Sequence, residues 1–376
     1  MSLNIPEPDL NALAVSEKLA TLIRDELIKE GGWLSFDRYM DRVLYEPGLG
    51  YYSAGSVKFG PLGDFITAPE ISPLLGRALA RQLLPMLAQL TVPVILEIGA
   101  GSGRLAASIL TELSDHISPL PEYRILEVSA ELRGRQRREL AAFSGQVSWL
   151  DELPADSFEG LIVANEVVDA FPVTRFVKDK SGVRILGVSG EGKGFAWAEA
   201  AGDSALIAKI RALEARLGRP LPVGYCSEIS CRLSPWLASL TERLARGALL
   251  IIDYGLVEHE YYHPSRSEGT LICHYRHRAH TDPFLYPGLQ DISAWVDFSA
   301  CASAAAHAGL TVAGFTTQGQ FLVELLEPSS MPFTVRQAQA FKTLVLPGEM
   351  GERFKLLLLT KGIEGALPGR DFRDRL

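Results

Sequence analysis

Short apolar segments alternate with segments of helical periodicity from residue 94 onward, and this alternation constrains the fold more than any other feature. The expected strands share an apolar composition: residues 94–99, 124–128, 147–150, 161–165, 248–253, 311–317 and 354–360. Helices are expected between them, as at 103–113 and 130–143. Apolar strands that alternate with helices pair in parallel and are buried on both faces. The pattern therefore predicts an α/β fold with a mostly parallel seven-stranded sheet and helices on both faces.

The rest of the chain divides into a cap and an insertion. Residues 1–90 are predicted to form a helical N-terminal cap, with a long segment at 46–73 that is dense in Gly, Pro and aromatic residues. Residues 174–246 are predicted to form an α+β insertion, a substrate-side subdomain with a three-stranded meander and two helices. The ligand-binding core then comprises residues 91–173 and 247–376.

Composition narrows the classes of partner. A net charge of −8 argues against nonspecific nucleic-acid binding, and no apolar run reaches the ~18 residues that a membrane span needs. The N-terminus has no signal or transit pattern, so a cytoplasmic location is expected. Residues 256–292 are predicted to be an irregular, basic loop. Its histidines, which include His274, His277 and His280, could alternatively bind a metal ion. The arginines between them repel a divalent cation, so no metal is expected.

The glycine-rich turn LEIGAGSGRLA follows the first expected strand. Gly99, Gly101 and Gly103 let the backbone turn sharply and approach a ligand. A dinucleotide fingerprint requires a small residue where Arg104 stands. An acidic residue (here Glu97) before GxGxG is instead typical of class I methyltransferases, which bind S-adenosylmethionine. A purely structural turn is the alternative.

Polar residues also follow the second and fourth expected strands. Glu127 ends the second strand, where a carboxylate can accept hydrogen bonds from both ribose hydroxyls of a nucleoside. Asn165, Glu166 and Asp169 follow the strand at 161–165, on the side of the cleft where a reacting group would lie. The alternatives are a helix-capping role for Glu127 and a polar loop after a buried strand.

The chain resembles the MidA family (mitochondrial dysfunction protein A) of class I methyltransferases. The resemblance spans residues 36 to about 320 and rests on FDRYMDRVLYEPGLGYY, GDFITAPEISPLLGRALA, YRILEVSAELRGRQ, LIVANEVVDAFPV, LLIIDYG and GTLICHYRHRAHTDPFLYPGLQDI, besides the glycine turn. It implies a Rossmann-like fold and S-adenosylmethionine as cofactor. Animal members are protein arginine methyltransferases needed for assembly of respiratory complex I. One departure is Trp295, which stands where the family commonly has His.

The resemblance also implies roles for particular residues. An arginine acceptor pairs bidentately with carboxylates, so Glu166 and Asp169 are the expected catalytic residues, with Asp64 and Glu70 as alternates. The segment GDFITAPEIS is expected to fold over the cofactor, or else to be a packed surface loop. The residues expected to bind S-adenosylmethionine are Thr67, Glu70, Glu97, Gly99, Ala100, Gly101, Gly103, Glu127, Val128 and Asn165.

The expected function is therefore methylation of an arginine in a protein substrate, by resemblance a complex I subunit. Three other functions stay open. These are methylation of a small molecule, nicotinamide-dependent oxidoreduction, which Arg104 disfavours, and a noncatalytic assembly role that keeps S-adenosylmethionine as a structural ligand. The sequence does not determine the oligomeric state.

Overall fold

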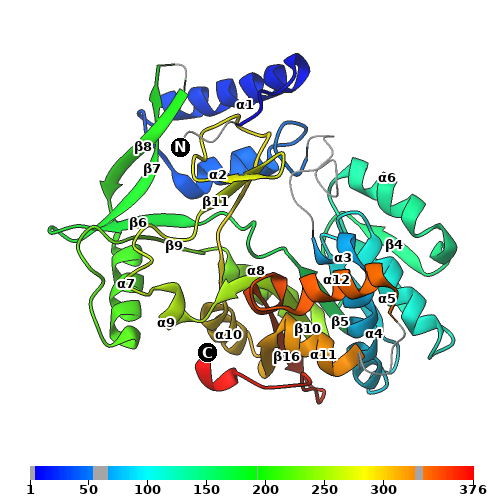
Figure 1. Cartoon of the computed structure of the whole chain (residues 1–376). Coiled ribbons are helices and arrows are strands. Elements are labelled where there is room, and N and C mark those ends of the chain that lie inside the picture. The colour runs from blue at the N-terminus through cyan, green and yellow to red at the C-terminus, as the bar shows by residue number, and fades with distance from the viewer. Residues whose placement is uncertain (1–4, 54–66, 193, 327–332) are drawn as a thin grey trace.

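The computed structural model describes residues 5–53, 67–192, 194–326 and 333–376 (Figure 1). Its main sheet has the strand order β15-β16-β10-β5-β2-β3-β4. The bounds are β2 Val94–Ile98, β3 Glu122–Leu126, β4 Val147–Leu150, β5 Phe158–Asn165, β10 Leu244–Leu256, β15 Thr311–Thr317 and β16 Phe354–Lys361. From β10 to β4 the pairing is parallel, and β16 pairs antiparallel with β10 and β15. The seven expected strands and their mostly parallel arrangement are confirmed.

Both faces of this sheet are covered, because successive side chains of a strand point to opposite faces. In β10, Leu250 and Ile252 pack with helices α4 (Leu74–Leu87), α5 (Arg104–Ser114) and α11 (Gln318–Leu326). Leu249 and Ile251 pack instead with α8 (Leu233–Arg243) and α10 (Phe298–His307). Helix α8, from the expected insertion, is therefore part of the packing of the main sheet.

A second, antiparallel sheet lies beside the N-terminal helices. It consists of β1 (Leu34–Ser35), β6 (Thr174–Lys178), β7 (Val183–Glu191), β8 (Gly194–Ala201) and β9 (Cys226–Ile229). Because β1 pairs with β7, the N-terminal segment and the insertion share one sheet. Helices α1 (Leu10–Lys29) and α2 (Phe36–Tyr45) lie against β7 at one end of the molecule (Figure 1). The aromatic rings of Phe36 and Trp197, 4.8 Å apart, join α2 to β8.

The expectation that residues 256–292 are irregular is wrong in part. They contain α9 (Glu258–Tyr261), β11 (Ile272–Tyr275), β12 (Arg278–His280) and the start of β13 (Asp291–Ser293), and β11 pairs antiparallel with both other strands. Cys273 and Ile292 lie opposite each other, and both are fully buried against α2. The strands are too short to show a periodicity, and contacts from a distant part of the chain stabilise them.

The remaining elements complete the layers. They are α3 (Ala68–Ile71), α6 (Ala130–Glu139), α7 (Ser204–Leu217), α12 (Val335–Val345), α13 (Met350–Arg353), the short strand β14 (Val296–Asp297) beside β10, and 3-10 turns at Ala141–Phe143 and Arg373–Arg375. Among the described residues, no helix combines the length and apolar character needed to cross a bilayer.

Candidate active site

A cavity of about 520 Å³ lies at the carboxyl ends of β2, β3 and β5. Its wall includes Glu97 to Ser102 at the end of β2, Leu126 to Val128 at the end of β3, and residues 165–167 at the end of β5. Residues in or beside α2, α3 and α8 also line it, as do Leu105 of α5, Leu132 of α6 and the segment 169–172. Parallel strands end at the same edge of a sheet, so polar residues at three separate strand ends meet around one hollow.

The glycine turn adopts a conformation that other residues rarely take. Gly99 and Gly101 have φ angles of +64° and +53°, and both lie on the cavity wall with Ala100 between them. Gly103, with φ of +89°, begins α5 outside the described wall. A Cβ atom at Gly103 would lie 3.2 Å from the Cα of Gln136, so this glycine permits close packing of α5 against α6.

Gln136 links the glycine turn to Glu127. Its side-chain amide donates hydrogen bonds to the Gly101 carbonyl (3.0 Å) and to Glu127 Oε2 (3.1 Å), and it accepts one from Trp149 Nε1 (2.9 Å). Glu127 Oε1 also accepts from the Ser129 amide at 2.8 Å. These bonds hold the carboxylate of Glu127 at the cavity wall.

The side chain of Glu97, at the end of β2, is buried. It accepts a hydrogen bond of 2.7 Å from the hydroxyl of Tyr123. Burial raises its pKa to about 7, although the Tyr123 bond acts in the opposite direction. Next to Glu127 the wall also holds Val128, an apolar side chain that is 73% exposed.

Helix α3 attaches to the glycine turn through Glu70. The carboxylate of Glu70 accepts a hydrogen bond from Ser102 and forms an ion pair of 3.0 Å with Arg104. Thr67 and Glu70 both line the cavity, so the described part of GDFITAPEIS borders the cavity, and contact of these residues with the cofactor stays a prediction. Asp64, the other alternate, lies outside the described residues. Arg104, which disfavours a dinucleotide turn, thus pairs with α3 beside the glycine turn.

Glu166 and Asp169 lie together at the end of β5. Glu166 has a left-handed backbone (φ +53°), and its amide donates to the Ile252 carbonyl of β10 at 2.8 Å. Burial, followed by the charge of Asp169, raises the pKa of Glu166 to about 8. Burial and the charge of Asp291 raise the pKa of Asp169 to about 7. The structure therefore brings two predicted catalytic carboxyl groups together in one poorly solvated place.

Two further aspartates, Asp253 and Asp291, lie next to this pair. Asp253 accepts backbone hydrogen bonds from Val168 (3.0 Å) and Asp169 (3.2 Å), and burial raises its pKa well above its usual range. Asp291 accepts from the hydroxyl of Tyr52 at 2.8 Å, and burial raises its pKa to about 6. We call Glu166, Asp169, Asp253 and Asp291 the carboxyl cluster. Four acidic groups so close together favour a bound cation or shared protons.

The described residues include buried oxygens of the wall without a hydrogen-bond partner. These are Asn165 Oδ1 and Asp169 Oδ1. Buried acceptors in native proteins normally have a donor, so both are suited to a ligand that carries N–H groups. No metal-ligand cluster of His, Cys, Asp or Glu occurs among the residues described.

Several residues of this site were not identified from the sequence. They are Asp41, Tyr45, Tyr52, Arg232, Trp236, Asp253, Tyr254 and Asp291. The rule that polar residues at strand ends bind ligands could have found Asp253 and Tyr254, which end LLIIDYG. Tyr254 donates a hydrogen bond of 2.7 Å to Asp169, and the ring of Trp295 meets it edge-on at 6.4 Å. Trp295 therefore contacts the carboxyl cluster indirectly, through Tyr254.

Comparisons with known proteins agree with this geometry. A family profile described as S-adenosyl-L-methionine-dependent methyltransferase matches residues 78–316. A crystal structure of a Burkholderia thailandensis protein bound to S-adenosyl-homocysteine superposes with a TM-score of 0.92 and 42% identity, covering 99% of this chain and 100% of that chain. A second structure from that organism has a TM-score of 0.90 and 41% identity, with coverage of 99% and 100%.

Curated relatives extend over most of the chain as well. "Protein arginine methyltransferase NDUFAF7 homolog, mitochondrial" of Drosophila melanogaster is 28% identical and covers 96% of this chain and 89% of its own length. "Protein arginine methyltransferase NDUFAF7, mitochondrial" of Mus musculus is also 28% identical, with coverage of 93% and 86%. The Rossmann-like fold is confirmed, and the chain belongs to the family of S-adenosyl-L-methionine-dependent methyltransferases, with S-adenosylmethionine as its methyl donor.

Proposed function

We propose that this protein methylates an arginine side chain of a protein substrate. The carboxyl cluster carries the proposal, because Glu166 and Asp169 line the cavity and the carboxyl groups of Asp253 and Asp291 lie next to them. A guanidinium is planar, permanently charged and able to bond two carboxylates at once. Its charge would favour the ionised forms of these groups, whose pKa values are raised mainly by burial and, except for Asp291, also by neighbouring carboxylates. The arginine methyltransferase names of the curated relatives support the same acceptor.

We infer that the cofactor lies against the ends of β2 and β3. Glu127 is placed to accept hydrogen bonds from ribose hydroxyls, and the exposed Val128 beside it suits an apolar ring. Gly99 and Gly101 leave room for the backbone to approach the ligand, while Glu97 and the free Asn165 oxygen suit an ammonium group. Thr67 would contact the cofactor from α3. Bound S-adenosylmethionine supplies an electrophilic methyl group.

Glu166 and Asp169 would orient the guanidinium and accept its proton. Their burial strengthens a hydrogen-bonded ion pair with the acceptor, because water competes poorly there. When a guanidinium nitrogen forms its new N–CH₃ bond, the sulfur–methyl bond breaks and one N–H proton leaves. Burial raises the pKa of Glu166 to about 8 in the empty site, and an adjacent guanidinium would lower it toward neutral pH, where a carboxylate is a suitable proton acceptor.

Aromatic side chains surround the approach to the carboxyl cluster. The rings of Tyr45 and Tyr52 stack with centroids 5.6 Å apart, and Phe171 meets Trp236 edge-on at 5.1 Å. All four line the cavity. Such walls pack against the methylene groups of arginine and attract its charged head through their faces. The resemblance to the MidA family extends the proposal to a respiratory complex I subunit as the protein substrate.

The test combines binding with transfer. Calorimetry with S-adenosylmethionine and S-adenosyl-homocysteine measures cofactor affinity, and mass spectrometry detects methylation of arginine peptides and complex I subunits. We expect Glu166→Gln and Asp169→Asn to lower the transfer rate at least ~100-fold, as loss of a positioned acid–base group does. The exposed Glu139→Gln in α6 is the matched control. Wild-type rates in both cluster variants, or transfer only to lysine or metabolites, would contradict the proposal.

A further inference from the structure

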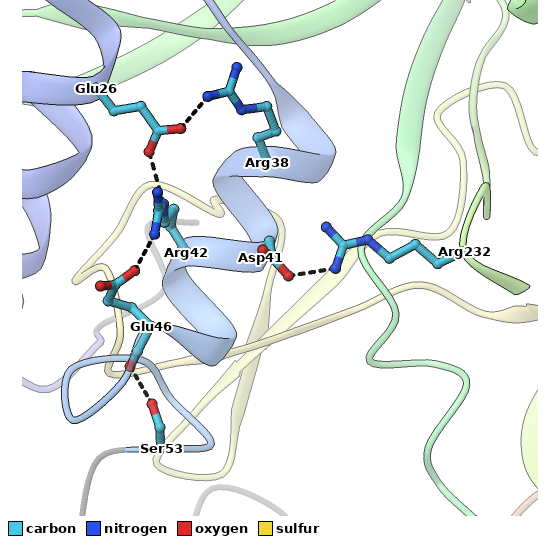
Figure 2. Close-up of polar contacts among 7 residues, drawn as sticks. All are labelled: Glu26, Arg38, Asp41, Arg42, Glu46, Ser53 and Arg232. Atoms are coloured by element: carbon cyan, nitrogen blue, oxygen red, sulfur yellow. Dashed lines mark hydrogen bonds and ion pairs between the residues drawn. The ribbon is translucent and has the colours of Figure 1, made fainter. Parts of the chain in front are cut away.

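An ion pair joins the N-terminal helices to the insertion on the cavity wall. Asp41 Oδ1, on α2, lies 2.6 Å from the guanidinium of Arg232, which directly precedes α8 (Figure 2). The two side chains are 41% and 45% exposed, so they form the solvent-accessible part of a wall whose deeper residues are buried. We call Asp41 and Arg232 the rim pair.

The basic residues of α2, Arg38 and Arg42, lie away from the described cavity wall. Arg38 and Arg42 form ion pairs with Glu26 of α1, and Arg42 continues to Glu46 (Figure 2). These residues do not belong to the described cavity wall, and their pairs connect α1 with α2. Asp41 is thus the acidic residue of α2 that faces the cavity.

The rim pair is adjacent to the tyrosines that border the carboxyl cluster. Tyr45 follows Asp41 by one helical turn, and its hydroxyl donates a 2.8 Å hydrogen bond to the carbonyl of Ala170, next to Asp169. The electrostatic environment of Tyr45 includes charges from Asp169 within the cluster and from both rim residues. An acceptor side chain that enters between the rim and the cluster would therefore experience both sets of charges.

We propose that the rim pair determines specificity for a cationic acceptor, with Asp41 neutralising Arg232 so that a guanidinium can enter. The inference rests on the proposed function, since it concerns how the same acceptor reaches its site. An unpaired Arg232 would repel an incoming cation, whereas an unpaired Asp41 would attract it. Because exposed ion pairs contribute little to folding, a change of either residue should act mainly through rim charge.

If the rim pair acts in this way, the two single variants must change the affinity for a cationic acceptor in opposite directions. Asp41→Asn leaves the rim with an excess positive charge, and Arg232→Gln leaves it with an excess negative charge. A unit charge roughly 8 Å from a ligand at a partly solvated site changes the dissociation constant about fivefold. The double variant restores a neutral rim and should lie within about twofold of wild type.

The experiment measures binding of two short peptides to protein saturated with S-adenosyl-homocysteine. One peptide contains a central arginine, and the other contains citrulline, its neutral isostere. We expect Asp41→Asn to weaken arginine-peptide binding about fivefold and Arg232→Gln to strengthen it by a similar factor, with citrulline binding unchanged. High salt should reduce both differences. Arg38→Gln is the control, because Arg38 is 44% exposed and forms its ion pairs with Glu26 and Glu30 away from the described cavity wall.

The outcomes separate this inference from the function on which it rests. A wild-type protein that binds both peptides equally overturns both proposals. A wild-type protein that prefers and methylates arginine, in which Asp41→Asn and Arg232→Gln shift affinity in the same direction or no more than Arg38→Gln, overturns this inference alone. In that case the rim pair only connects α2 to α8.

Discussion

Replacement of Glu166 by Gln should stabilise the cofactor-free protein at alkaline pH while it removes a proposed catalytic group. The Glu166 carboxyl has its pKa raised from 4.5 to about 8 by burial and by Asp169. Between these values the folded state holds a proton that the unfolded chain has released. The free energy of unfolding therefore decreases as pH rises through this window, and the full decrease is reached above pH 8.

The size of the effect follows from the same two values. A rise of the Glu166 pKa from 4.5 to about 8 lowers the free energy of unfolding by at most ~5 kcal/mol, at ~1.4 kcal/mol for each pKa unit. Glu166 borders the cavity and is only partly buried, so water in the cavity reduces this figure. We expect ~1–3 kcal/mol. The amide side chain of the Glu166→Gln variant has no proton to lose in this range, and its oxygen can still accept the hydrogen bond that Asn165 donates at 3.3 Å.

Urea unfolding at pH 5 and pH 8.5 without cofactor measures the difference. We expect Glu166→Gln and wild type to be nearly equally stable at the lower pH, and the variant to be more stable by ~1–3 kcal/mol at the higher pH. Glu139→Gln, at an exposed carboxylate, should follow wild type at both pH values. A variant whose advantage does not grow with pH would refute the view that the buried carboxyl cluster is destabilising.

Two further predictions concern the cofactor side. Glu127→Gln should weaken S-adenosylmethionine binding ~10–100-fold in calorimetry, since hydrogen bonds to a charged group contribute ~1.5–3 kcal/mol; Glu122→Gln, at an exposed position of the same strand, should not. Gly103→Ala should lower the free energy of unfolding by ~1–3 kcal/mol, because φ is +89° and the new Cβ would lie 3.2 Å from Gln136. Cofactor affinity should fall too, since Gln136 holds Glu127. Gly145→Ala, in open space, is its control, and equal stability of the two variants would contradict this account.

Much of the fold could be predicted because the relevant signals are local. A strand that is buried on both faces is apolar along its length, so β2, β5 and β10 are visible by themselves, and the regular alternation of strand and helix indicates the others. Glycines mark the turn after β2, where positive φ angles are required. Glu127, Asn165 and Glu166 could be predicted as wall residues because parallel strands bring their carboxyl ends to one edge.

The acceptor side depends on contacts between distant parts of the chain. Asp41 and Arg232 are 191 residues apart, and no local pattern distinguishes Asp41 from the other charged residues of α2. Asp291 and Tyr52 meet only because α2 packs against β13. The small sheet around β11 was missed for the same reason.

The sequence by itself determined the main sheet, the glycine turn and which strand ends would line the cavity, because periodicity and glycine act within a few residues. Only the tertiary structure decided which side chains share the acceptor end of the cavity and how strongly they are perturbed. The pKa of Glu166 reflects burial and the nearby charges of Asp169 and Asp291. Burial and charge pairing are properties of neighbours in space, and for Asp291 those neighbours come from more than a hundred residues away in the chain.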